Sequence, residues 1–359
     1  MEKIEKLKHK LLAFSASGGS SGLIRSEKHR RRTIFVFIVL SVLLLVATGL
    51  YLYSRTIAKM NYVISAGVEI ADGALASVLA RALPHLYGMI GAAVVLAVVS
   101  LSFQTITQSR VLTPSMIGFD SVFVGTQTML VFFFGAHHIL FASPFVNYFV
   151  TAGLMVVVSI VMFGAILRSQ RNNIIFLLMF GLVLSSVLMN GARYLQLLMT
   201  EADFFQVAAA TSVNVNNMNE GIIWIALPIM LAVVVISIVR HRRLNVMSLG
   251  PEQAKSLGIA YEKEMRINLI LIAIGMSAAT ALIGSLTFLG LLAVNAAREV
   301  FKTYKHLPLF IGSALMAALV LVAGQGVMEM LLGAIPVTVI IDLVGCTYVF
   351  ILILKENRL

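Results

Sequence analysis

The stretch MSLGPEQAKSLGIAYEKEMR occupies residues 247–266 and separates two strongly apolar runs of the chain. The preceding run ends in IVR at 238–240, and the next begins with INL at 267–269. Charged and polar side chains are frequent between them. Because such side chains are costly in lipid, this interval predicts a surface loop between two buried segments.

The loop carries the signals of a short helix. Gly250 or Ser248 can cap it, and Pro251 suits its first position because the missing proline N–H would be unbonded there. Glu252 favours the positive N-terminal end of the helix dipole. Gly258 suits the left-handed residue just past the end. These signals predict a helix of about two turns.

The composition of the whole chain indicates a membrane protein. Of its 359 residues, 59% are hydrophobic and only 12% are charged, whereas a soluble domain carries about 25% charged residues. Apolar runs of about 20 residues, the length that crosses a bilayer, recur along the sequence. Backbone groups in lipid must be bonded internally, so these runs predict helices. We expect an all-α polytopic bundle.

Ten apolar segments are expected, with both termini on the same side of the membrane. The run beginning at Ile267 is too long for one helix and too short for two full spans, and Gly284 and Gly290 offer bend points within it. We therefore expect a span followed by a short or re-entrant helix. The ten segments are 33–53, 84–106, 115–134, 147–167, 174–192, 220–239, 267–284, 286–300, 309–328 and 336–354.

The distribution of basic residues predicts on which side of the membrane the two termini lie. Of the 27 Lys and Arg residues, only Arg55, Lys59, Arg81 and Arg193 fall in outer loops if the N-terminus is cytoplasmic. The positive-inside rule supports this orientation, with both termini in the cytoplasm. The net charge of +11 is therefore a topology signal and does not indicate nucleic-acid binding.

The expected domain organisation has three parts. Residues 1–32 form a basic cytoplasmic segment with the Gly/Ser linker SASGGSSG. Residues 33–355 form the transmembrane domain, with a cytoplasmic loop at 244–266, and residues 356–359 form a cytoplasmic tail.

The order of residues in the loop resembles a known family. LGPEQAKSLGI is similar to the L-G-x-x-x-A-x-x-L-G loop of FecCD/BtuC-type permeases, the membrane subunits of binding-protein-dependent ABC importers for ferric siderophores, haem and cobalamin. In that family this loop is the coupling helix that docks on the ATPase. The resemblance assigns that role to Leu249, Gly250, Pro251, Glu252, Gln253, Ala254, Lys255, Leu257 and Gly258.

Four further stretches carry the resemblance. The matching residues are Gln104, Thr107, Pro114 and Gly118; Phe288, Gly290, Leu291 and Arg298; the segment TYKHLPL (303–309); and Ile335, Pro336, Val337 and Gly345. The chain also departs from the family. Gln108, Ser109 and Arg110 replace R-N-P, and Val294 and Asn295 replace P-H. The narrower pattern is most similar to ferric anguibactin and petrobactin permeases.

The resemblance implies a BtuC-like bundle in the bacterial inner membrane that imports a ferric siderophore. The implied partners are a pair of ATP-hydrolysing subunits, a second permease (a second copy or a paralogue) and an extracytoplasmic substrate-binding protein. The chelated iron is cargo. The chain has no G-x-x-x-x-G-K-[ST] motif, so we expect no ATP site of its own, and we expect no catalytic residues, resident metal or cofactor.

Three sets of residues remain as site candidates. The candidate translocation path comprises Gln104, Thr107, Asn216, Asn217 and Asp342. Asn217 could instead cap a helix, with Glu220 three residues later completing a capping box. Arg81 and His85 are candidates for docking the binding protein, although the family's outer R-x-P-R reads Ala82-Leu83-Pro84-His85 here.

A rival reading is an ion-driven secondary transporter. Asp120 and Asp342 both fall inside expected spans, and an intramembrane carboxylate is a functional candidate because it is costly to bury. Such a carrier would use the two carboxylates as a proton relay and would work without an ATPase.

Overall fold

The computed structural model describes residues 31–57, 74–168, 174–213, 215, 218–331 and 337–356, and these residues form helices and connecting turns only. The expected all-α fold class is therefore confirmed for the described chain. Residues 1–30 with the Gly/Ser linker, the tail 357–359, Asn216, Asn217 and Pro336 lie outside the described residues. The architecture below is that of the compact unit Leu44–Leu359.

A helix corresponds to each of the ten apolar runs. After the helix Arg31–Ile57, the long helices are α2 (Ala74–Ile106), α3 (Phe119–Phe134), α5 (Pro144–Arg168), α6 (Ile174–Leu197), α8 (Glu220–Val239), α11 (Tyr261–Ile283), α12 (Leu289–Phe301), α13 (His306–Leu331) and α14 (Val337–Glu356). Shorter elements are η1 (Ser115–Ile117), α4 (Ile139–Ala142), α7 (Glu201–Thr211), α9 (His241–Met247) and α10 (Pro251–Ser256).

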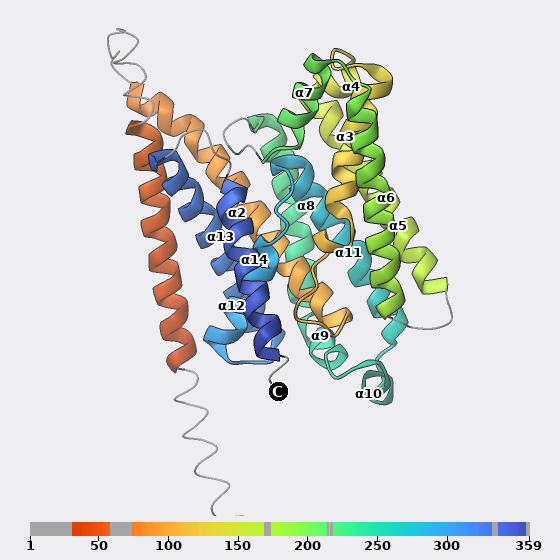
Figure 1. Cartoon of the computed structure of the whole chain (residues 1–359). Coiled ribbons are helices and arrows are strands. Elements are labelled where there is room, and N and C mark those ends of the chain that lie inside the picture. The colour runs from red at the N-terminus through yellow and green to blue at the C-terminus, as the bar shows by residue number, and fades with distance from the viewer. Residues whose placement is uncertain are drawn as a thin grey trace, which may run out of the picture. The chain divides into compact units, whose positions relative to one another are not determined.

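Helix α2 is the centre of the unit. It packs against α8, α11, α12 and α13, while α3 packs against α5, α6 and α7 (Figure 1). The α2 helix begins ten residues before the expected start at 84 and continues through Pro84. The sequence Ala82–His85, which straddles the expected start of this segment at 84, is therefore helical throughout.

The break between α11 and α12 is where it was expected, but only one glycine makes it. Gly284 ends α11 with φ +98°, a conformation that side-chain-bearing residues rarely adopt. Gly290 lies inside α12, and a Cβ there would fall 2.1 Å from Ser100 Oγ on α2. The prediction of a bend at Gly290 was wrong, because that glycine is required for close packing of two helices.

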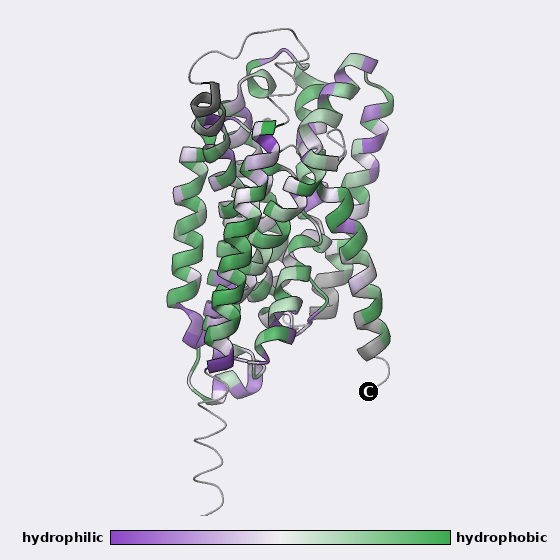
Figure 2. Ribbon diagram, turned by 90° about the vertical axis from the view of Figure 1, so that its left-hand side faces the viewer, coloured by the Kyte–Doolittle hydropathy of each residue, from purple (hydrophilic) through white to green (hydrophobic). Residues whose placement is uncertain are grey.

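Hydrophobic residues run along the middle of the long helices, and hydrophilic residues gather toward both ends (Figure 2). Six described helices are long and apolar enough to cross a membrane. Helices α9 and α10 lie at one end of the unit, and α4 and α7 lie at the opposite end (Figure 1). Neither α7 nor α9 was expected from the sequence.

Candidate functional site

The loop between α8 and α11 folds as its local signals predict. Helix α10 begins at Pro251 after Gly250, which has φ +101°, and ends at Ser256. Gly258 has φ +81°; its N–H donates to the Lys255 carbonyl, and the next N–H donates to the Ala254 carbonyl. This pair of bonds is a Schellman ending, which needs a left-handed residue at that point.

Two exposed leucines flank helix α10. Ala254 is fully buried against the unit, whereas Leu249 and Leu257, just before and just after the helix, are 56% and 63% exposed. Lys255 and Glu262 form a loose exposed ion pair with 3.6 Å between Nζ and Oε1. Two exposed leucines around a rigid, capped helix are typical of a docking element.

A buried carboxylate fixes the two ends of this loop. Glu264, in the first turn of α11, is 4% exposed and forms ion pairs with Arg240, at the end of α8, and with Arg243 on α9. The two oxygens of one carboxylate thus bind a cation each, in the arrangement that makes charge-assisted bonds strong. The α8–α9 junction and the start of α11 are therefore joined directly.

His306 connects α9 to the central helix α2. Asn245 Oδ1 accepts the backbone N–H of His306 at 2.8 Å and also lies 2.8 Å from its ring Nδ1. Because Oδ1 only accepts, Nδ1 carries the proton. The other ring nitrogen, Nε2, lies 2.7 Å from Oγ1 of Thr105 on α2, and the Thr105 hydroxyl also bonds to the Leu101 carbonyl at 2.9 Å. One imidazole therefore bridges two helices that are far apart in sequence.

The turn after α2 completes this contact. Gln108 Nε2 donates to the carbonyls of Thr105 and Met247, at 2.8 and 3.1 Å, so the turn is bonded to the end of α9. The Arg110 carbonyl accepts from the amides of Gln104 and Asn295, both at 3.0 Å. We call the surface formed by α9, α10, this turn and the start of α13 the coupling face.

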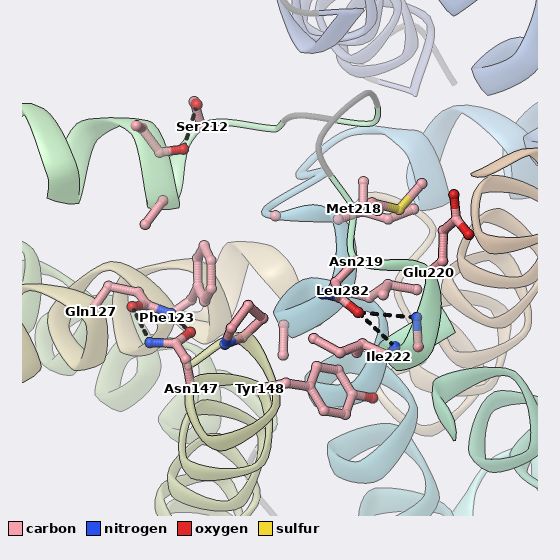
Figure 3. Close-up of a pocket in the computed structure, with 17 residues that line it drawn as sticks. Phe123, Gln127, Asn147, Tyr148, Ser212, Met218, Asn219, Glu220, Ile222 and Leu282 are labelled. Carbon is pink, nitrogen blue, oxygen red and sulfur yellow. Dashed lines mark hydrogen bonds between the residues drawn. The ribbon is translucent and has the colours of Figure 1, made fainter. Parts of the chain in front are cut away.

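A second polar region lies at the opposite end of the unit. A pocket of about 710 Å³ opens between α3, α5, α7, α8 and α11. Figure 3 shows the side-chain amides of Gln127 and Asn147 paired on one wall of the pocket, and Asn219 and Glu220 on the other side of it. The two bonds between the amides measure 2.9 and 3.1 Å. The pocket is lined by hydroxyl, amide and carboxylate groups together with Tyr148 and Phe123.

The comparisons with known proteins decide the family. A model of the FecCD transport family matches residues 40–355. The chain belongs to the FecCD transport family. This confirms the resemblance inferred from the motifs, and the FecCD chain is accordingly a multi-pass permease subunit of an ABC importer in the bacterial inner membrane.

Two relatives of the FecCD chain illustrate the similarity. It is 37% identical over 260 residues to the petrobactin import system permease protein YclO of Bacillus subtilis, covering 72% of this chain and 82% of that protein. It is 30% identical over 342 residues to the petrobactin import system permease protein FatC of Bacillus anthracis, covering 95% and 94%.

A solved structure shows the same fold. An inward-facing metal-chelate type ABC transporter superposes with a TM-score of 0.74 at 19% identity, covering 90% of the FecCD chain and 99% of the other. At this identity the match supports the helical architecture and carries no residue roles.

The translocation-path candidates do not converge. In the FecCD chain Gln104 and Thr107 are buried at the coupling-face end of α2, where Thr107 donates to the Phe103 carbonyl of its own helix. Asp342 is half-buried on α14, and its Oδ1 has no hydrogen-bond partner among the described residues. Asn216 and Asn217 are outside the described residues.

The residue that caps α8 is Asn219, whose Oδ1 accepts the N–H groups of Gly221 and Ile222 at 3.0 and 3.4 Å. The suggested cap at Asn217 was wrong, because α8 begins at Glu220 and a cap must directly precede the first helical residue. Asn219 instead combines capping with a place in the wall of the pocket between α3, α5, α7, α8 and α11, which we call the outer pocket because the proposed orientation puts it on the extracytoplasmic side.

The two docking candidates differ in exposure. Arg81 is exposed, whereas His85 is 6% exposed and its Nδ1 donates to the Arg81 carbonyl at 2.6 Å, one helical turn away. Both lie on α2, so the early start of that helix determines which of the two reaches solvent.

Asp120 has a local partner. Thr287, in the break between α11 and α12, donates to its Oδ2 at 2.6 Å. Thr287, which lies in the connection that follows Gly284, thus fixes the position of the carboxylate at the start of α3. The described residues contain no group of three or more His, Cys, Asp or Glu side chains that could hold a metal.

Sequence reasoning missed two buried ionic clusters. One is Glu264 with its two arginines. The other joins the helix Arg31–Ile57 to α13: Arg55 lies 3.6 Å from Glu329 Oε1 and donates to Tyr51 Oη at 2.8 Å. The available signal was an acid next to an apolar run, Glu264 just before the run that begins at Ile267 and Glu329 just after the run that ends at 328, for which a basic partner could have been sought.

Proposed function

We propose that this permease carries a ferric siderophore of the petrobactin class into the cytoplasm. The names of the two relatives, both petrobactin import permeases, support the cargo class. The outer pocket, with its amide, hydroxyl and aromatic lining, offers groups suited to a polar chelate, and we assign cargo entry to it.

The observation that carries the importer mechanism is the coupling face. Helix α10 begins at Pro251, ends in a Schellman motif and is flanked by the exposed Leu249 and Leu257. The segments on either side of it are bonded to the rest of the unit: Glu264 pairs with Arg240 and Arg243, and the Met247 carbonyl at the end of α9 accepts from Gln108. A force applied to α10 would pass through Ser248–Gly250 to α9, and from Met247 to Gln108 in the turn after α2. We assign Leu249–Gly258 as the element on which an ATP-hydrolysing subunit docks.

The complete transporter would contain two permeases, two ATPases and an extracytoplasmic binding protein. Cargo moves inward if ATP binding and hydrolysis shift the pair of permeases between outward and inward states that differ in their affinity for the chelate. In the proposed topology, ten segments lie in the membrane with both termini in the cytoplasm, and the coupling face is then on the same side as the ATPases. Arg81 is the exposed group at the outer end of α2 that we assign to contact with the binding protein.

Uptake of radiolabelled iron–petrobactin by cells with and without this chain tests the proposal. We expect ATP-dependent uptake only when the chain is present, and unlabelled ferric petrobactin should compete while ferric citrate should not. Purification from native membranes in mild detergent should recover an ATPase in equal number with the permeases. Equal uptake in its absence, or purification of the chain alone, would show that the assignment is wrong.

A further inference from the structure

A second cavity, of about 700 Å³, lies behind the coupling face. It is bounded by the end of α2 and the turn that follows it, by Ser248 and Leu249, and by the α12–α13 connection. Three cationic side chains, Arg110, Arg298 and Lys302, line it, and no Asp or Glu is among its lining residues.

The cavity carries an excess of positive charge. Arg110 and Arg298 carry guanidinium groups, which stay protonated at neutral pH. Helices α2 and α12 both end here, and each C-terminus supplies roughly half a negative charge. The helix ends thus offset about one of three positive charges.

Backbone strain is concentrated at the same place. Gln108 has φ +50° and Lys302 has φ +46°, and they are the non-glycine residues with positive φ in the described chain. Both line this cavity. Gln108 is held there by its bonds to the Thr105 and Met247 carbonyls. Strained conformations persist where the surroundings fix them, and they cluster at ligand sites.

We propose that this cavity binds a phosphate group, presented by a soluble phosphate or by the headgroup of an anionic phospholipid. Paired guanidinium groups match the geometry of phosphate oxygens, and a phosphate with nearly two negative charges matches the remaining excess. Basic pockets on the cytoplasmic side of membrane helices also suit the paired phosphates of cardiolipin. Binding of a lipid headgroup requires the membrane orientation given under the proposed function, whereas binding of soluble phosphate does not.

Occupancy of this cavity would act on coupling. Leu249 is both a wall of the cavity and the first residue of the docking segment, and Gln108 joins the cavity to the end of α9. A phosphate held by Arg110 and Arg298 would tie the turn after α2 to the end of α12. The site therefore links phosphate or lipid supply to the stiffness of the coupling face.

The test is thermal unfolding of the full-length chain in nanodiscs. In phosphatidylcholine discs, inorganic phosphate is titrated at constant ionic strength; in a second series, cardiolipin replaces part of the phosphatidylcholine. A ligand that binds only the folded chain raises Tm in a saturable way. We expect Arg298→Gln to raise the ligand concentration needed for half of the maximal Tm increase by roughly tenfold or more. Lys302→Asn, which keeps a residue tolerant of positive φ, should also raise this concentration.

Arg266→Gln is the matched control, because it removes an exposed arginine at the start of α11 outside the cavity and should leave the response unchanged. Stabilisation by phosphate in phosphatidylcholine discs identifies a soluble source, and stabilisation by cardiolipin alone identifies a lipid source. Equal responses of the wild type, Arg298→Gln and Lys302→Asn would overturn the proposal. An increase in Tm on addition of the ATPase subunit, but not of phosphate or cardiolipin, would also overturn the proposal. The cavity would then be assigned to a carboxylate of that partner. Neither series needs cargo or uptake, so the result is separate from the proposed function.

Discussion

Glu264 shows how one side chain can set the geometry of a whole loop. It is buried, and its two oxygens bind arginines from the end of α8 and from α9. Replacing Glu264 by Gln leaves Arg240, which is only 18% exposed at its side chain, without an anion. We expect a loss of about 3 kcal/mol in stability, the low end for breaking a buried pair because Arg243 is partly solvated.

Thermal unfolding of Glu264→Gln, together with iron–chelate uptake, measures this effect. The matched control is Glu262→Gln, which breaks only the exposed pair with Lys255 and should cost less than about 1 kcal/mol. Similar losses in the two variants would mean that the buried cluster contributes no more than a surface pair.

Asn245 makes a different prediction, which concerns coupling more than stability. Its side-chain oxygen accepts two donors of His306, and the same imidazole reaches Thr105 on the central helix. Asn245→Ala leaves both donors unpaired, at a cost of about 2 kcal/mol. We expect ATP hydrolysis to continue while the amount of cargo moved per ATP falls severalfold. Ser186→Ala, which loses one exposed bond to a carbonyl of its own helix α6, serves as the control. An unchanged ratio would remove His306 from the coupling route.

At the scale of elements, α10 works as a rigid body because both its ends are fixed. The combined change Pro251→Gly, Glu252→Ser and Ala254→Gly removes the first-turn proline, the favourable dipole charge and the buried anchor. We expect ATP-driven uptake to be lost while the protein still inserts in the membrane in normal amounts. Western blotting of membranes and uptake measured on the same cells check both halves. Retained uptake would contradict the assignment of α10 as the docking element.

The same elements show what sequence could and could not predict. Helix α10, its proline start and its left-handed Gly258 were predicted because each signal lies within a few residues of the structure it specifies. The bond from Thr287 to Asp120 could not be predicted, because it joins positions 167 residues apart and depends on how α3 meets the α11–α12 break. Gly290 was misjudged for the same reason. Because Gly290 has no side chain, α12 can pack closely against α2, and no residue in α12 itself indicates this contact.

At the scale of the molecule, the family and the membrane class followed from composition and motifs, whereas the position of the two polar regions required the fold. The outer pocket and the coupling face lie at opposite ends of the unit Leu44–Leu359, and α2, which is buried along most of its apolar length, runs between them (Figure 1). Alternating access requires communication between such ends. The bonds of Thr105 and Gln108 attach the coupling face directly to the helix that spans that distance.

Topology gives the prediction for the whole molecule. His137, in the turn before α4, and Arg242, on α9, are both exposed, and α5, α6 and α8 lie between them in sequence. If all three helices cross the membrane, the two positions are on opposite sides. In a Cys346→Ala background, His137→Cys should react with a membrane-impermeant maleimide in intact spheroplasts. Arg242→Cys should react only after permeabilisation.

The Cys346→Ala chain serves as the control for non-specific labelling, because Cys346 is the single cysteine and its replacement leaves no thiol. Labelling of Arg242→Cys from outside would show that the orientation is the reverse of the proposed one. The bilayer would then separate the coupling face from any cytoplasmic ATPase. The resulting conflict with an ATP-driven importer makes this a test of the mechanism as well as of the topology.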